Sequence, residues 1–143
     1  MTVILRNIVG FLIGLVLGGA VNMGLIVLGP LIIPPPQGVD VTDPEALSAS
    51  MHLFEARHFV FPLFSHASGT FTGSVAAFFI AASYRTQISY VVGTAFFAGG
   101  IAASFMIPAP AWFVAVDLVF AYFPMAWIGQ KLAYRMVHAP KNL

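Results

Sequence analysis

The sequence contains no cysteine and few charged residues. Of its 143 residues, 8% are charged and 59% are hydrophobic, whereas soluble domains carry about 25% charged residues. A soluble domain of this length could not bury so much apolar side chain. The missing cysteines exclude disulfides, thiolate metal sites and thiol nucleophiles. Low charge and high hydrophobicity together predict an integral membrane protein.

The sequence also lacks the usual nucleotide-binding and nucleic-acid-binding patterns. Its glycine runs lie inside apolar stretches rather than in a phosphate-binding loop, and Walker, Rossmann and zincin signatures are missing. No run of basic residues indicates nucleic-acid binding. We therefore expect the lipid bilayer, and no nucleic acid, as a partner.

Four apolar stretches are long enough to cross a bilayer as helices. We place these spans at about residues 8–33, 59–83, 88–107 and 111–133 of a single transmembrane domain, residues 1–143. The prolines at 30 and 34–36 should end the first span, because proline lacks a donor and clashes with the preceding turn. The predicted fold class is all-α, an integral membrane bundle of four transmembrane helices.

A short amphipathic helix is expected in the first outer loop, at about residues 43–58. Either Thr42 and Glu45 form a capping box, or Asp43 caps the helix with Pro44 at its first position. We expect this helix to lie at the membrane surface and to continue into the second span, with a kink at Pro62. Its stripe at helical spacing consists of Leu47, Met51, Phe54, His58 and Phe61.

Small residues recur at every fourth position in the first two spans, and each set shares one helix face. Such stripes let helices approach closely, within one subunit or between copies. The first stripe is Gly10, Gly14 and Gly18, followed by Asn22, and the second is Ser65, Gly69, Gly73, Ala77 and Ala81.

The distribution of charge predicts the topology. Four acidic residues fall in the first loop with only Arg57 opposing them, and the other basic residues fall at the amino end, the second turn and the carboxyl end. The positive-inside rule then places both termini in the cytoplasm. We expect the protein to lie in the inner membrane of a bacterial cell. The acidic residues are Asp40, Asp43, Glu45 and Glu55, and the basic ones are Arg6, Arg85, Lys131, Arg135 and Lys141.

Three polar residues should lie at a similar depth. Asn22, His66 and Asp117 each fall about 10 Å inside the outer boundary at 1.5 Å of rise per residue. A carboxylate in hydrocarbon must be paired or neutralised, so we expect His66 to pair with Asp117, and Asn22 and Ser104 to complete the hydrogen bonds. These four residues are candidate ligand-binding residues.

Three interpretations of this cluster stay open. Polar side chains often only join transmembrane helices to one another. Alternatively, the cluster binds a small molecule, a proton or an ion, or His66 and Asp117 act as a base and its orienting group. In that last case Ser65, Ser68 and Thr70 are nucleophile candidates only because they lie near His66 in the sequence.

A second group, His52, Glu55 and His58, is a candidate metal site. Glu-x-x-His motifs ligate iron or manganese in di-metal bundles, but those sites need further carboxylates from other helices. Only Asp117 is available within the spans. One metal bound by both Glu55 and His66 requires a sharp kink at Pro62. The alternative is that His52, Glu55 and Arg57 are the solvated flanks of the surface helix.

The sequence resembles a group of small bacterial four-span membrane proteins that has no assigned function. The resemblance covers nearly the whole chain and therefore implies the four-span fold, but no activity, cofactor or site residue. It rests on the stretches Val21-Asn22-Met23-Gly24, Ile33-Pro34-Pro35-Pro36-Gln37-Gly38-Val39-Asp40, His66-Ala67-Ser68-Gly69-Thr70 and Pro108-Ala109-Pro110-Ala111-Trp112-Phe113.

From the small size and the stripes we first expect a non-enzymatic protein that acts by association, as a homo-oligomer or as an accessory subunit of a larger membrane complex. The first alternative is transport or binding of a small ligand, proton or ion at the polar cluster. The second is a membrane enzyme that acts on a lipid-soluble substrate. No cofactor is indicated by the sequence.

Overall fold

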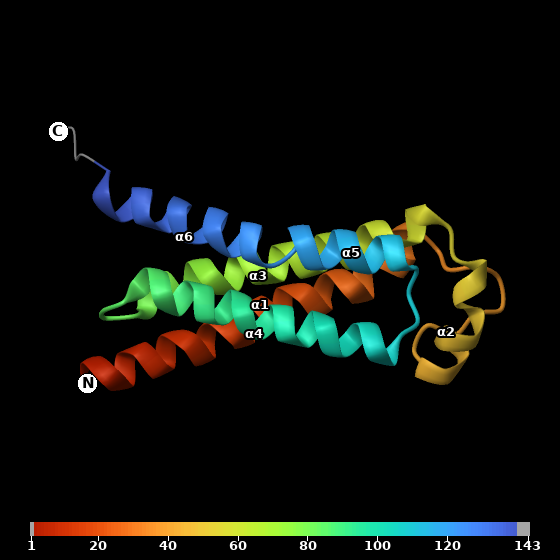
Figure 1. Cartoon of the computed structure of the whole chain (residues 1–143), viewed down its shortest axis with the longest axis horizontal. Coiled ribbons are helices and arrows are strands. Elements are labelled where there is room, and N and C mark those ends of the chain that lie inside the picture. The colour runs from red at the N-terminus through yellow and green to blue at the C-terminus, as the bar shows by residue number, and fades with distance from the viewer. Residues whose placement is uncertain (1, 140–143) are drawn as a thin grey trace.

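The computed structural model describes residues 2–139, and its regular elements in that range are all helical. Helices α1 (Val3–Ile32), α3 (Val60–Ile80) and α4 (Arg85–Met106) run along the molecule beside α5 (Ala111–Phe120) and α6 (Phe123–His138) (Figure 1). The predicted all-α class is confirmed. Three stretches are long and apolar enough to cross a membrane: Val3–Ile32, Arg85–Met106 and Ala111–His138.

Helix α3 is not one of these three stretches. It lies at the centre of the bundle, where it contacts α1, α4 and α6. Its three buried hydroxyl groups, on Ser65, Thr70 and Ser74, all donate hydrogen bonds. Ser74 on α3 and Ser89 on α4 exchange hydrogen bonds, because each hydroxyl donates to the other residue's carbonyl, at 3.2 and 2.8 Å. Both side chains are fully buried, so this reciprocal pair fixes α4 against α3.

The two small-residue stripes meet each other. Gly14 lies against Gly73, and Gly18 lies against Gly69, so closely that a Cβ on Gly18 would stand 2.5 Å from the Gly69 carbonyl oxygen. Such contacts leave no space for a side chain. The prediction of close helix packing is therefore confirmed within the subunit, between α1 and α3.

The connection from α1 to α3 differs from the single surface helix expected at 43–58. It consists of a short helix α2 (Pro44–Ser50) and two 3₁₀ turns, η1 (Met51–Leu53) and η2 (Ala56–Phe59). Asp43 caps α2, since its carboxylate accepts a hydrogen bond from the Glu45 N–H at 2.9 Å. Extended backbone at Phe54 and Glu55 separates the two turns.

Three prolines affect the helices differently from the prediction. Pro30 lies inside α1, which continues to Ile32. Pro62 lies in the first turn of α3, where its missing N–H breaks no helical hydrogen bond. The predicted span 111–133 is broken at residues 121–122, because the ring of Pro124 would clash with the Phe120 carbonyl in a continuous helix.

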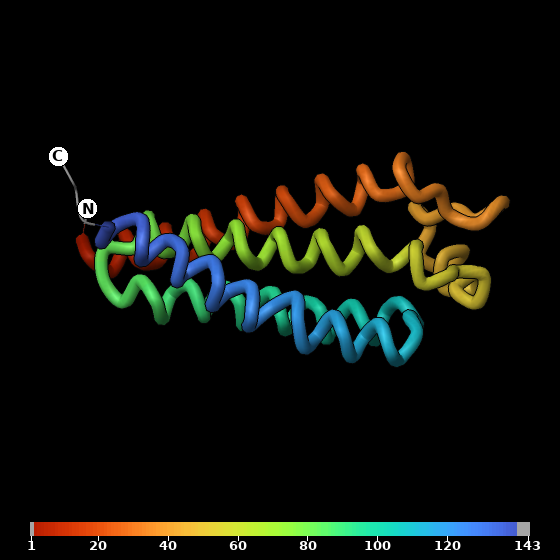
Figure 2. Tube along the Cα trace, turned by 90° about the horizontal axis from the view of Figure 1, so that it is seen from above, coloured from red at the N-terminus to blue at the C-terminus, as the bar shows by residue number. Residues whose placement is uncertain are grey.

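The two ends of the bundle differ in charge and in contacts. Figures 1 and 2 place the start of α1, the α3–α4 turn and the end of α6 at one end, and α2 at the other. At the first end, Arg6 and Arg85 donate to the Ile80 and Ala81 carbonyls at 3.2 and 3.1 Å, which otherwise lack helical partners. Lys141, which the topology prediction also used, lies outside the described residues.

The adjacent glycines 18 and 19 provide a test of the α1–α3 contact. We expect Gly18→Ala to lower the free energy of unfolding by about 1–3 kcal/mol, because the added methyl overpacks against Gly69. Gly19→Ala is the matched control, since a Cβ there meets nothing within 4 Å. Thermal unfolding of both variants in detergent measures the difference, and equal stability of the two would contradict the packing.

Candidate functional site

Asp117 and His66 form a pair inside the bundle. Asp117 lies on α5 and His66 on α3, and their atoms Oδ1 and Nδ1 are 2.8 Å apart. The side chain of Asp117 is only 6% exposed, whereas that of His66 is 22% exposed. The pairing that we predicted from depth alone is therefore confirmed. The carboxylate is enclosed, and the imidazole forms the accessible side of the pair.

Tyr122 is a third member of this cluster that the sequence analysis missed. Its hydroxyl donates to Asp117 Oδ2 at 2.8 Å and lies 3.3 Å from His66 Nδ1. In a continuous helix, a residue five positions after Asp117 would point about 140° away from it. The break between α5 and α6, where Tyr122 has φ −114° and ψ −82°, turns the ring back toward the carboxylate.

Gly100 on α4 makes room for this tyrosine. A Cβ at position 100 would run into the hydroxyl and the ring of Tyr122, which is 2% exposed. The backbone of α4 thus forms the wall behind the Asp117–Tyr122 hydrogen bond. A glycine in an apolar helix gave no indication of this contact in the sequence.

The other two candidate ligand-binding residues do not join the cluster. Ser104 donates to the Ile101 carbonyl of its own helix at 2.7 Å, although it lines the pocket described below. Asn22 packs against Gly69 between α1 and α3, and its buried Oδ1 has no hydrogen-bond partner among the described residues. The expectation that both complete the hydrogen bonds of the pair is therefore wrong.

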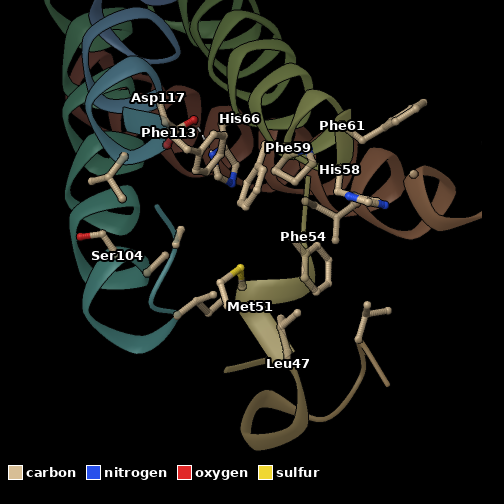
Figure 3. Close-up of a pocket in the computed structure, with 18 of the residues that line it drawn as sticks. Leu47, Met51, Phe54, His58, Phe59, Phe61, His66, Ser104, Phe113 and Asp117 are labelled. Atoms are coloured by element: carbon tan, nitrogen blue, oxygen red, sulfur yellow. Dashed lines mark hydrogen bonds and ion pairs between the residues drawn. The ribbon is translucent and has the colours of Figure 1, made fainter. Parts of the chain in front are cut away.

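A pocket with a cavity volume of about 270 Å³ opens beside the pair, at the α2 end of the bundle. Its walls are mostly apolar and come from the ends of α1 and α4, from α5, from the start of α3 and from the α2–η1 segment. Figure 3 shows His66 with one ring nitrogen directed at Asp117 and the other at the interior of the pocket. The labelled lining residues include Leu47, Met51, Phe54, Phe59 and Phe113.

Aromatic rings form one wall of this pocket. The ring of Phe59 lies 4.8 Å from that of Phe113 and 5.5 Å from that of Trp112, measured between centroids. Phe54 lies 6.3 Å from Phe59. The pocket thus combines an aromatic, apolar wall with the His66–Asp117 pair and few other polar groups, which is the usual character of a small-molecule site.

The metal candidates His52, Glu55 and His58 are each engaged locally. The Glu55 N–H donates to Nδ1 of His58 at 2.9 Å, and the Glu55 carboxylate pairs with Arg57 at 3.1 Å. His52 Nδ1 lies 3.0 Å from the Ala49 carbonyl. Within residues 2–139, no three His, Cys, Asp or Glu side chains come together in an arrangement for a metal ion, and no kink at Pro62 brings Glu55 to His66.

The pair has the form of a base with its orienting group, because Asp117 holds Nδ1 and leaves Nε2 of His66 toward the pocket. Two of the three nucleophile candidates do not complete it. Ser65 donates to the Pro62 carbonyl at 2.7 Å and Thr70 to the His66 carbonyl at 2.9 Å, so both hydroxyls bond to their own helix.

Comparisons with protein families, curated proteins and solved structures find no match to this chain. The resemblance to the four-span bacterial group therefore stays an expectation, and any function must be argued from the site itself.

The hydroxyl of Tyr122 can be tested by removing it. We expect Tyr122→Phe to lower the free energy of unfolding by about 1 kcal/mol, because Asp117 Oδ2 then loses its donor inside the bundle. Tyr134→Phe, which makes the same change at a half-exposed position, should have little effect. Thermal unfolding in detergent compares the two variants, and a neutral Tyr122→Phe would show that the hydrogen bond contributes no stability.

Proposed function

We propose that this protein binds a small lipid-soluble molecule in the pocket at the α2 end, with His66 as the polar anchor. The observation that carries the proposal is that one ring nitrogen of His66 faces an apolar cavity while Asp117 and Tyr122 hold the rest of the cluster. Apolar walls with few polar groups are typical of ligand pockets. The pocket volume, about 270 Å³, suits a ligand of modest size.

We also propose the membrane arrangement in which this site operates. The protein crosses a bacterial inner membrane four times, through α1, α3, α4 and the broken helix α5–α6, and both termini lie in the cytoplasm. Two observations support this: α3 lies among the three apolar stretches as their central partner, and the acidic loop containing α2 lies at the end opposite the arginines of α1 and α4. The pocket then belongs to the outer half of the membrane.

Action by association, our first expectation from the sequence, remains a prediction. The stripes that motivated it pack against each other within the chain, so they no longer favour a second copy or a larger complex. The enzyme alternative draws support from the His66–Asp117 pair, but the hydroxyls of Ser65 and Thr70 bond to their own helix. Ligand binding uses the pair and the pocket together, and we therefore prefer it.

Two adjacent alanines on α4 offer a test of ligand binding. Ala103 lines the pocket, so Ala103→Phe should fill it, whereas Ala102 is exposed on the outside of the helix and Ala102→Phe serves as the control. We expect mass spectrometry after mild extraction to find a retained small molecule on the wild type and on Ala102→Phe, and at least tenfold less on Ala103→Phe. Equal retention by all three, or none by any, would contradict the proposal.

The same native mass spectra report the oligomeric state, because each species is weighed intact. A wild-type complex with a second protein, with no small molecule retained, would favour the accessory-subunit alternative over ligand binding.

The absence of cysteine makes the topology testable by single-cysteine labelling. We expect a membrane-impermeant maleimide to label Glu45→Cys on intact spheroplasts and to label Gln87→Cys only after permeabilisation. Both positions are exposed, so access decides the result. Labelling of Gln87→Cys on sealed spheroplasts would reverse the orientation, and labelling of both there would contradict the four-span arrangement.

A further inference from the structure

We propose that residues 40–53, which include α2 and η1, form a lid that opens to admit a ligand to the pocket and closes when the ligand is bound. We call these residues the lid segment. The inference rests on the proposed function, because it concerns access to the same pocket. It follows from the hydrogen bonds of the lid segment, from its attachment to the bundle and from the backbone on either side of it.

The hydrogen bonds of the lid segment are local. Thr42 donates to the carboxylate of Asp40 through its N–H and its hydroxyl, at 2.8 and 2.6 Å, and the Met51 carbonyl accepts from the adjoining Phe54 N–H at 3.1 Å. Within residues 2–139, no hydrogen bond or ion pair joins the lid segment to α1, α3, α4 or α5. Movement of the segment away from the bundle therefore breaks no polar contact.

The lid segment is attached to the bundle by apolar side chains that line the pocket. These side chains are Val41, Leu47 and Met51, and Figure 3 shows Leu47 and Met51 on the opposite side of the pocket from Asp117. Helix α2 and η1 contain no buried residue, and α2 packs mainly against η1. A segment with few buried apolar contacts opens at a small cost in free energy.

The backbone offers a pivot on either side of the lid segment. Before it, Gly38 has φ +81°, which glycine adopts without strain, and nothing lies within 4 Å of the position of a Cβ there. After it, Phe54 and Glu55 have extended backbone between η1 and η2. The chain is then fixed again, since the Glu55 N–H donates to Nδ1 of His58 at 2.9 Å and Phe59 is buried. The hinges of moving segments are a few loop residues of this kind.

A ligand in the pocket would hold the lid segment closed. Leu47 and Met51 line the pocket on the lid, whereas Phe59 and Phe113 line it on the bundle. A molecule between them contacts both sides only when the lid is closed, so its binding favours the closed state. If it binds that state alone, the ratio of open to closed lid falls about tenfold when the free ligand concentration is ten times its Kd.

The test measures the position of the lid by double electron–electron resonance, and the lack of native cysteine makes spin labelling specific. Labels on Glu45→Cys in the lid and Ala102→Cys on α4 report the lid. Labels on Gln87→Cys and Ala102→Cys, both on α4, are the matched control, and all three positions are exposed. The full-length protein in detergent is first stripped of retained small molecules, which mass spectrometry verifies, and naphthalene is then added as the probe.

We expect two distance populations for the lid pair without naphthalene, one for the open and one for the closed lid. Naphthalene at ten times its Kd should lower the ratio of open to closed lid about tenfold, and the control pair should not change. Isothermal titration calorimetry supplies the Kd, with the pocket-filled variant Ala103→Phe as the baseline for partition into micelles.

The rates of naphthalene binding give a second test. Met51→Ala removes an apolar contact that holds the lid closed, so it should raise both the association and the dissociation rate about threefold to tenfold. Val114→Ala, which removes part of the pocket wall on α5 instead, should raise the dissociation rate alone. Stopped-flow fluorescence of naphthalene measures both rates. A Met51→Ala variant in which only dissociation changes would make Met51 a wall residue and would contradict the lid.

Each contrary result has a separate meaning. A single distance population that naphthalene leaves unchanged would overturn the lid. Two populations that naphthalene does not shift, although it binds above the Ala103→Phe baseline, would show a mobile segment that is not coupled to the pocket, and this also overturns the inference. Both results leave ligand binding intact. Binding of naphthalene no stronger than that baseline would argue against the proposed function itself, and the inference would fall with it.

Discussion

The need to neutralise one carboxylate in an apolar bundle governs the arrangement of this molecule. Asp117 is almost completely enclosed, and such a group is tolerated only when it is paired and hydrogen-bonded. Three segments around Asp117 contribute to this pairing and hydrogen bonding. Helix α3 supplies His66, the α5–α6 break supplies Tyr122, and α4 supplies the glycine that makes room for the tyrosine. Removing any one of them leaves a polar group without its partner.

The close approach of α1 to α3 positions the face of α3 that does not carry His66. The glycine contacts at Gly14–Gly73 and Gly18–Gly69 place α3 at the centre, where it also contacts α4 and α6. His66 is offset from this stripe around the helix, since it follows Ser65 by one residue, or about 100°. One face of α3 therefore packs against α1 while the neighbouring face carries the polar group toward α5, so packing and chemistry use different sides of one helix.

The sequence was informative where a single periodicity decides the outcome. Hydrophobic length predicted the long helices, the four-residue spacing predicted close helix packing, and depth alone predicted the His66–Asp117 pair. It was uninformative where the backbone leaves its regular path. Tyr122 reaches Asp117 only because the helix breaks ahead of Pro124, and Asn22 turns toward Gly69 instead of the pair. Depth along a helix cannot give the direction in which a side chain points.

The location of the pocket follows from the same constraint. The hydrogen bonds of Asp117 hold α5 against α3 at one level of the bundle, while the α2–η1 segment covers the end above it with apolar side chains. The pocket between this level and the α2–η1 segment is bounded by aromatic rings and by the imidazole of His66. This imidazole cannot rotate away without losing its hydrogen bond to Asp117. The contact between His66 and Asp117 that joins α3 to α5 therefore also fixes the imidazole at the edge of the pocket. The stability of the bundle and the shape of the pocket depend on the same pair.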